Sequence, residues 1–289
     1  MRTFTAVVNP TAGGSASART LIPLARRLRE AGATLTVEYS RDLGHARDLA
    51  RTAAARGDVV LGVGGDGMAG GVGGALAGTD AVYGIVPAGR GNDFARQLGL
   101  PTGIEELAEL LLHGEATPVD VLTVNGEPAL GSVYAGVDAV ANTYANDTRL
   151  LRGKASYTWG ALRAFAGWRP TTYTVTVDGT PMERRAYTVV AANSGYYGFG
   201  RRIAPGAVVD DGLIDVVIIR HGSRRLFVTV MNELETGSHV GRPEVEVLRG
   251  TEVRIEASRD LPYGCDGELP GRLPVTVGVL PSALRVIRP

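Results

Sequence analysis

Lysine is almost absent from this sequence, and its absence excludes two common kinds of phosphate-binding protein. Lys and Arg together number 30 among the 289 residues, and Lys154 is the single lysine. A Walker A loop places a lysine directly after its last glycine, and a protein kinase places one on a strand beside the nucleotide. Lys154, in LLRGKASY, fits neither pattern. A phosphate site in this chain must therefore use backbone amides, helix N-termini, arginine or a metal ion.

Cysteine, net charge and long apolar runs are also scarce. The one cysteine, Cys265, excludes an intramolecular disulfide framework and favours a reducing, cytoplasmic compartment. Because the formal net charge is +0, no overall field attracts nucleic acid as a partner. No apolar run approaches the ~18 residues of a transmembrane helix, and the first ten residues do not resemble a signal peptide. We therefore expect a cytoplasmic protein with one large or two ordinary domains.

The first part of the chain alternates short apolar strands with amphipathic helices. The predicted strands are 4–8, 34–40, 58–65 and 82–89, and the predicted helices are 20–32, 44–57, 91–101 and 104–114. This alternation predicts a parallel sheet that helices cover on both faces. Ligands of such sheets bind at the carboxyl ends of the strands.

Beyond about Pro118 the sequence becomes rich in β-type segments. Asn-Gly and Asp-Gly pairs separate several of them, which predicts hairpin turns and a second, mainly antiparallel domain. Residues 157–168 and 223–234 are predicted helical inserts. The first insert carries Trp159, Phe165 and Trp168, and both an interfacial helix that dips toward lipid and an ordinary core helix remain open.

Half of the residues in LGVGGDGMAGGVGGALAG, residues 61–78, are glycine. Each glycine costs roughly 1 kcal/mol in a helix, so we expect a ligand to approach this backbone closely. Gly62, Gly64 and Gly67 match the dinucleotide pattern G-x-G-x-x-G, but this pattern alone is weak and follows the third strand. Asp66 would repel a phosphate unless a cation lay between them, which favours a magnesium ligand. A flexible loop with a capping aspartate is the alternative.

Two further loops follow strands at the same predicted edge of the sheet. NPTAGG, residues 9–14, offers open amides before a helix, which suits an anion. PAGRGNDF, residues 87–94, places glycines around Arg90, and Asn92 and Asp93 are also ordinary helix caps. The three loops are expected to converge on one crevice.

Taken in order, NPTAGG, GGDG, PAGRGNDFAR, DDGLIDV and DGE resemble the diacylglycerol kinase catalytic-domain family. That family contains bacterial lipid kinases and the sphingosine kinases and is distantly similar to NAD kinases. The resemblance covers nearly the whole chain. It implies a nucleotide-binding α/β domain over 1–120 and a β-sandwich-like acceptor domain over 121–289, whose final strand packs back near the first domain.

The resemblance also implies the activity. Similar proteins transfer a phosphoryl group from ATP, with Mg2+, to a hydroxyl of a lipid such as diacylglycerol, in the cleft between the domains. A peripheral membrane contact and a homodimer remain open. Two other functions also remain open: a pseudokinase that binds nucleotide or lipid without catalysis, and a kinase for a different hydroxyl, such as that of NAD or of a specialised metabolite.

Individual residues take roles from their position in the matching motifs. Glu268 matches the general base, with Asp266 beside it, and Asp66 and Asp120 match the acids that hold catalytic magnesium. A structural magnesium site, built largely from main-chain oxygens, is matched by Val208, Asp211 and Leu213. The expected ATP contacts are Asn9, Pro10, Thr11, Ala12, Gly13, Ser40, Gly64, Gly65, Asp66, Gly67, Met68, Arg90 and Asn92. The pairs Asp211-Gly212 and Asp266-Gly267 are also plain turn sequences.

The sequence departs from the family pattern in the glycine run. Met68 stands in place of a threonine, and Gly70-Gly71 stand where similar proteins carry Asn-Glu. Arg90 replaces a second threonine and offers a positive charge in place of the absent loop lysine. The main acids remain, which favours an active kinase.

Overall fold

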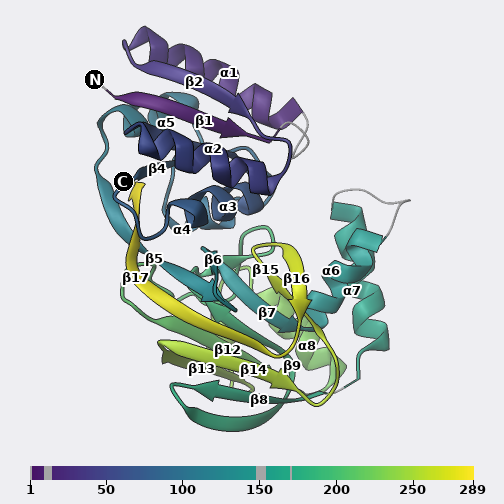
Figure 1. Ribbon diagram of the computed structural model, residues 1–289. Helices are drawn as coiled ribbons and strands as arrows, with labels where there is room; N and C mark the ends of the chain where they lie inside the picture. Colours follow the sequence, from purple (N-terminus) through teal and green to yellow (C-terminus); the bar gives the residue numbers. More distant parts are fainter. Residues whose placement is uncertain (1, 10–14, 148–153, 170) are drawn as a thin grey trace.

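The computed structural model describes residues 2–9, 15–147, 154–169 and 171–289. Figure 1 shows two lobes, one above the other, with both chain ends in the upper lobe. Within the first predicted phosphate loop, Pro10, Thr11, Ala12 and Gly13 lie outside the described residues.

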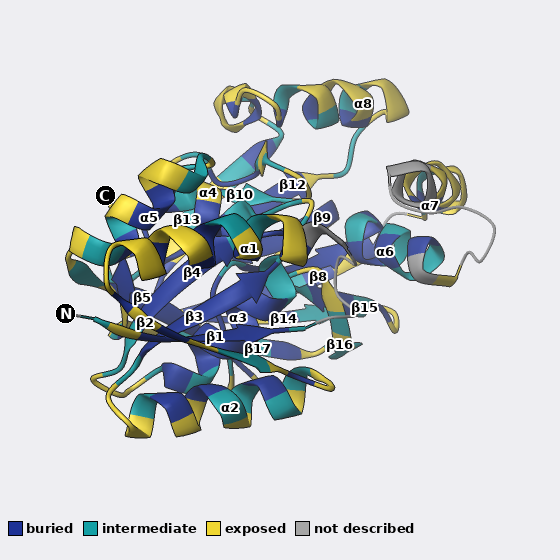
Figure 2. Ribbon diagram, turned by 90° about the horizontal axis from the view of Figure 1, so that it is seen from above, coloured by how far each residue is buried: buried dark blue, intermediate teal, exposed yellow. Residues whose placement is uncertain are grey.

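The upper lobe has the predicted alternation of strands and helices. Its elements are β1 (Thr3–Val8), α1 (Ser15–Glu30), β2 (Thr34–Tyr39), α2 (Leu43–Ala55), β3 (Val59–Gly64), α3 (Asp66–Leu76), β4 (Val82–Pro87), α4 (Asp93–Gln97) and α5 (Ile104–His113). The strands pair in parallel in the order β4-β3-β1-β2. Leu24 of α1 and Leu111 of α5 pack on one face, and Ala50 of α2 and Val72 of α3 pack on the other. Figure 2 shows α1 and α2 on opposite sides of the buried strands.

The lower lobe is mainly antiparallel. Its elements are β5 (Ala116–Val124), β6 (Glu127–Ala129), β7 (Ser132–Gly136), α6 (Val137–Asp147), α7 (Lys154–Gly167), β8 (Thr171–Val177), β9 (Thr180–Ala192), β10 (Tyr196–Tyr197), β11 (Arg201–Arg202), β12 (Ile214–Arg220), α8 (Arg224–Glu233), a 3-10 turn η1 (Ser238–Gly241), β13 (Val245–Gly250), β14 (Glu252–Ala257), β15 (Pro262–Cys265), β16 (Glu268–Arg272) and β17 (Val275–Ile287). Asn125-Gly126 and Asp178-Gly179 have positive φ at both residues, which confirms the predicted hairpin turns.

Several helices differ from the sequence expectation. Helix α3 lies in the glycine run, where no helix was predicted, and α4 covers Asp93–Gln97 rather than 91–101. Helix α1 begins at Ser15 rather than near Thr20. Ser17 is buried, so packing extends the helix into a segment whose serines and glycines predicted a turn. Helix α6 was not predicted, and it follows β7 directly at Gly136, whose φ is 156°.

Strand β17 belongs to both lobes. It pairs antiparallel with β14 and β5, and Arg285 and Val286 near its end pair in parallel with β4. Within the described residues, one 15-stranded sheet therefore runs from the lower lobe into the upper lobe. This continuity fixes the edge of the parallel sheet against the strands that carry the lower half of the site.

The second half of the glycine run serves helix packing. A Cβ on Gly71 would lie 2.3 Å from Leu43 of α2, and one on Gly74 would lie 2.9 Å from Pro128 of β6. A Cβ on Gly73 would lie 2.8 Å from Leu130 and 3.0 Å from Tyr83. Helix α3 thus fits between α2 and the lower lobe only because it lacks side chains there. The close approach expected from the sequence is made here by protein atoms.

Gly73→Ala is expected to destabilise the protein although alanine favours helix. Overpacking a filled site typically costs about 1–3 kcal/mol, which exceeds the roughly 1 kcal/mol that alanine gains in a helix. Urea unfolding measures the change. The control is Gly167→Ala at the end of α7, where a Cβ meets nothing within 4 Å and stability should hold or rise slightly. Equal stability of the Gly73 variant and the parent would show that the neighbours of α3 can accommodate a methyl group at this position.

Candidate active site

One large cavity lies between the two lobes, at the carboxyl ends of β3 and β4. Its volume is about 1100 Å³. We call the part lined by the upper lobe the glycine end; it includes Gly65, Asp66, Gly67, Gly89, Arg90 and Asp93. We call the part lined by the lower lobe the apolar recess; it includes Tyr134, Val137, Asp138, Ala141, Asn142, Leu162, Thr188, Phe227 and Met231. Glu268 lines the same cavity.

The two loops of the glycine end cross each other backbone to backbone. A Cβ on Gly89 would lie 2.3 Å from the Cα of Gly65, so neither loop has space for a side chain at the crossing. Asn92, in the left-handed region with φ 52°, closes its loop by accepting from the Gly89 amide at 2.9 Å and donating to the Gly89 carbonyl at 3.1 Å. Helix α3 begins beside this crossing, and no side chain of the described residues caps it. Its open N–H groups suit an anion.

Asp66 joins the two loops. Its Oδ1 accepts from the backbone N–H of Asp93 at 2.6 Å and of Phe94 at 3.3 Å, so it caps α4 across the cavity edge. Its Oδ2 lies beside Gly91, where a Cβ would come within 2.6 Å. Asp66 thus caps a neighbouring helix rather than its own, and it lines the cavity as predicted.

Asp93 was considered in the sequence only as a helix cap, and the structure gives it more contacts. Its two carboxylate oxygens accept from the backbone N–H groups of Phe199 and Gly200 in the lower lobe, at 3.1 and 2.6 Å. Burial, together with the nearby Asp66 carboxylate, raises the pKa of Asp93 to about 6, although the two N–H groups oppose the shift. No sequence signal paired Asp93 with residues so far along the chain.

Glu268 comes from the lower lobe and lies beside Gly67 of the glycine end. The turn between β15 and β16 reaches α3, so a Cβ on Gly67 would lie 3.7 Å from Glu268 Oε1. Asp266 holds this turn by accepting from three successive backbone N–H groups, those of residues 130–132, at 2.9 to 3.1 Å. Burial raises the pKa of Asp266, and these N–H groups limit the shift. A Cβ on Gly70 would lie 2.9 Å from its Oδ2, so the missing side chain in α3 leaves room for this carboxylate.

The apolar recess contains a small polar cluster that the sequence analysis missed. Asp138 accepts from the Thr188 hydroxyl at 2.8 Å, and burial raises its pKa to about 6. The Asn142 side chain donates to the Tyr134 hydroxyl at 3.1 Å and to the Gly267 carbonyl at 2.9 Å. Its Oδ1 is buried and has no partner among the described residues. The available signal was one isolated acid in the apolar run VYAGVDAVA.

Several predicted ATP contacts do not line the cavity. Met68 is 4% exposed and packs in the core of the upper lobe beneath Gly64. Ser40 is buried at the end of β2, and its hydroxyl donates to the Val8 carbonyl at 3.3 Å. Asn9 follows β1 directly. The structure thus brings Gly65, Asp66, Gly67, Arg90 and Glu268 together around the cavity. Of the predicted contacts that the structure describes, those not among its lining residues are Asn9, Ser40, Gly64, Met68 and Asn92.

Asp120 is not among the residues that line the cavity, whereas Asp66 is. It is 1% exposed, and its carboxylate oxygens accept from the backbone N–H groups of Gly212 and Ser282, both at 2.7 Å. It therefore connects β5 to the loop before β12 and to the bulge of β17. Asp66 also accepts from two backbone amides, so these contacts do not distinguish the two acids, and a magnesium ion shared by Asp66 and Asp120 stays a prediction.

The structural magnesium site expected at Val208, Asp211 and Leu213 stays a prediction, and the structure gives the Asp211 side chain two protein partners. Asp211 accepts from Leu213 N–H at 3.1 Å and is paired with the guanidinium of Arg249. Val208 is exposed. In the part of the chain that is described, no group of three or more His, Cys, Asp or Glu residues is placed to hold a metal. The positive charge at this loop comes from arginine.

Comparison with known proteins groups the chain with one family. Residues 3–124 match the diacylglycerol kinase catalytic domain, and residues 131–288 match the YegS C-terminal NAD kinase beta sandwich-like domain. A protein named diacylglycerol kinase from Mycobacterium tuberculosis (strain CDC 1551 / Oshkosh) is 33% identical over 99% of this chain and 94% of the relative. Another of that name, from Bacillus subtilis (strain 168), is 26% identical over 98% of this chain and 95% of the relative.

Solved structures share the architecture. A Bacillus anthracis protein superposes with a TM-score of 0.80 at 22% identity, covering 100% of this chain and 95% of that one. A second, named a diacylglycerol kinase, gives a TM-score of 0.72 at 21% identity, covering 100% and 97%. This likeness confirms the predicted α/β lobe and the antiparallel, β-sandwich-like lobe. With domain matches over both lobes and a relative 33% identical along nearly the whole chain, the protein belongs to the diacylglycerol kinase catalytic domain family.

Proposed function

We propose that this protein transfers the terminal phosphoryl group of ATP, with Mg2+, to a hydroxyl of a diacylglycerol-like lipid. The observation that carries the proposal is a single cavity in which an uncapped helix N-terminus, an aspartate and a glutamate face an apolar recess. The glycine end suits phosphates, and the recess suits the apolar part of a lipid. The names of the relatives support a lipid as the acceptor.

In this reaction the acceptor hydroxyl attacks the terminal phosphorus while the bond to the bridging oxygen of ADP breaks. Glu268 accepts the hydroxyl proton, since its carboxylate lies beside Gly67 at the start of α3 and lines the cavity. Asp66 suits a magnesium ion because magnesium takes one or two carboxylates and completes its shell with phosphates and water. When bound, this ion neutralises charge on the phosphates. Arg90 is exposed at the same end and is placed for a phosphate oxygen.

The polar cluster of the recess is proposed to orient the acceptor. Asp138 and the unpartnered Oδ1 of Asn142 are hydrogen-bond acceptors inside an otherwise apolar wall. They suit a ligand that carries hydroxyl donors near an apolar body. The Asn142 amide also bonds to Gly267, which precedes Glu268, so this cluster lies next to the proposed base.

The rim of the cavity is proposed to contact a membrane surface. Trp159 and Leu162 of α7 and Phe199 are 46%, 63% and 37% exposed, and Leu162 and Phe199 line the cavity. Phe165 and Trp168 are half-buried instead, so the aromatic stripe seen in the sequence divides between rim and core. No helix among the described residues has the length and apolarity to span a membrane.

A phosphorylation assay tests the proposal. The protein is incubated with Mg2+ and ATP labelled in its terminal phosphate, and with mixed micelles containing diacylglycerol, sphingosine or no lipid, or with NAD in buffer. We expect label in the diacylglycerol arm. Label only with sphingosine or NAD would reassign the acceptor. ATP binding by calorimetry without transfer in any arm would favour the pseudokinase, and absence of both would overturn the proposal.

Asp138→Asn is expected to change how stability depends on pH. The folded pKa of Asp138, about 6, lies above its ordinary value of 3.8, so the folded state binds more protons between these values. Stability contributed by this group therefore falls as pH rises from about 4 to about 6. Asparagine does not ionise, so the stability of the variant relative to the parent should improve by roughly 1–3 kcal/mol between pH 4 and pH 7. The free energy of unfolding of both proteins is measured with urea at each pH. A difference between variant and parent that stays the same from pH 4 to pH 7 would refute this burial effect.

A further inference from the structure

A short hairpin of the lower lobe forms part of the cavity wall under backbone strain. Its strands β10 and β11 pair Tyr197 with Arg201, and Gly198, Phe199 and Gly200 between them have φ of 56°, 72° and 87°. All of these residues line the cavity. Positive φ is uncommon for a bulky residue such as Phe199, so this turn depends on support from its surroundings.

Asp93 of the upper lobe supports the tip of this hairpin. Its Oδ1 accepts from Gly200 N–H at 2.6 Å, and its Oδ2 accepts from Phe199 N–H at 3.1 Å. One carboxylate thus holds two successive amides of the strained turn, and bonds to an ionised group are stronger than neutral ones. The Gln97 side chain of the same helix accepts from Gly195 N–H at 3.0 Å, just before the hairpin.

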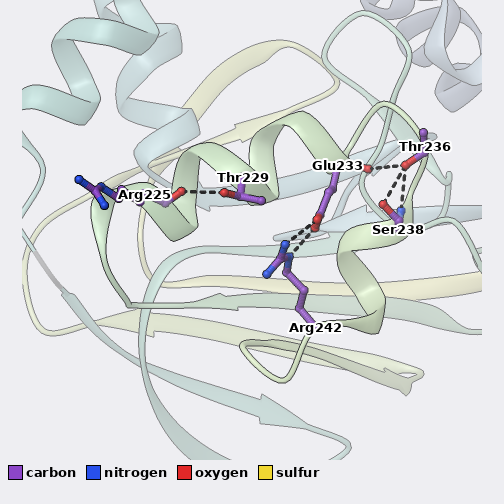
Figure 3. Close-up of polar contacts among 6 residues, drawn as sticks. All are labelled: Arg225, Thr229, Glu233, Thr236, Ser238 and Arg242. Carbon is purple, nitrogen blue, oxygen red and sulfur yellow. Dashed lines mark hydrogen bonds and ion pairs between the residues drawn. The ribbon is translucent and has the colours of Figure 1, made fainter.

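The base of the hairpin is fixed to α8. Arg202 donates through its backbone to the Leu234 carbonyl at 2.7 Å and through its side chain to the Thr236 carbonyl at 3.4 Å. Figure 3 shows that this end of α8 is itself held, because Glu233 accepts two hydrogen bonds from Arg242, at 2.5 and 2.6 Å. With its base fixed in the lower lobe, the hairpin depends on Asp93 for the position of its tip.

The hairpin continues into the wall of the apolar recess. Tyr197 packs edge-on against Tyr134, with ring centroids 6.0 Å apart and an interplanar angle of 74°. Tyr134 accepts from Asn142, which also bonds to Gly267, the neighbour of Glu268. A displacement of the hairpin would therefore act on the polar cluster beside the proposed base.

We propose that Asp93 is a positioning residue for the acceptor, an inference that rests on the proposed function. Asp93 holds the hairpin in place, and the hairpin in turn fixes the position of the cavity wall near Asn142 and Glu268, where the acceptor hydroxyl binds. Both carboxylate oxygens of Asp93 accept from amides of the lower lobe. Asp93 therefore influences the part of the cavity proposed to bind the lipid, although in the sequence it directly follows a loop proposed to bind the nucleotide. Its loss should weaken use of the lipid and leave ATP binding intact.

Asp93→Asn tests this, because the amide group repels one of the two N–H donors while its oxygen still accepts from the other. We expect the KM for dioctanoylglycerol in mixed micelles to rise between about tenfold and 10²-fold, as for a misplaced wall, with the calorimetric Kd for ATP within about twofold of the parent. Hydrogen exchange of the peptide that covers 196–202 should become about tenfold faster. Asp48→Asn, exposed on α2, is the matched control.

Gly200→Ala disturbs the same turn independently, since its φ of 87° disfavours a side chain. It should give the same rise in KM, and the double variant should be no worse than the poorer single variant. Unchanged exchange over 196–202 in Asp93→Asn, or loss of ATP binding with a normal lipid KM, would overturn the inference. If the parent phosphorylates no lipid, the proposed function fails, and the exchange rates and ATP affinity alone then decide whether Asp93 holds the hairpin.

Discussion

Asp66→Asn is expected to lower turnover by about 10³-fold, because charge neutralisation at the phosphates dominates this kind of transfer. The amide keeps an oxygen that accepts from Asp93 N–H, the bond that measures 2.6 Å in the parent, so the cap of α4 survives. It removes the negative charge proposed to hold magnesium. Initial rates with saturating ATP and diacylglycerol measure the loss, and the variant should need more Mg2+ for half-maximal rate.

Asp48→Asn serves as the control, since this aspartate is exposed on α2 and pairs only with its neighbour Arg51 among the contacts described. It should turn over like the parent. Near-parent turnover of the Asp66 variant would mean that the carboxylate serves only to join the two glycine loops.

Glu268→Gln is expected to lower kcat by ~10²–10⁴-fold, the usual contribution of a positioned general base. Glutamine keeps the shape of the side chain near Gly67 and removes its ability to take a proton. The Kd for ATP, measured by calorimetry, should change little.

Glu127→Gln is the matched control for this experiment, because its side chain is 76% exposed. If ATP affinity collapses in the Glu268 variant while this control is normal, Glu268 holds the nucleotide or its metal ion and is not the base.

The fold could be predicted from the sequence because the signals for its strands, helices and turns are local. Alternating strands and helices, and the Asn125-Gly126 and Asp178-Gly179 turns, each depend on a few adjacent residues. The glycine end was also predictable, since carboxyl ends of parallel strands share one edge. This rule predicts that Asp66 and Arg90 share one crevice, and both residues line the cavity.

Contacts between distant segments could not be predicted in the same way. Nothing local indicates that Asp120 accepts from Gly212 and Ser282, or that Asp93 holds a hairpin of the other lobe. The glycines of α3 were misleading for the same reason. Glycine is used both where a neighbouring helix needs space and where a phosphate needs space. Only the packing in the structure distinguishes the two uses.

The path of β17 has a consequence for the order in which the molecule is completed. During synthesis the ribosome releases β4 long before Arg285 and Val286, the residues that pair with it. Until then the parallel sheet has an open edge, and open edges recruit foreign strands. The upper lobe thus gains this edge partner only when the end of β17 is made, although its other strands are made first. We therefore expect a nascent chain of this protein to be more prone to aggregation until β17 pairs with β4.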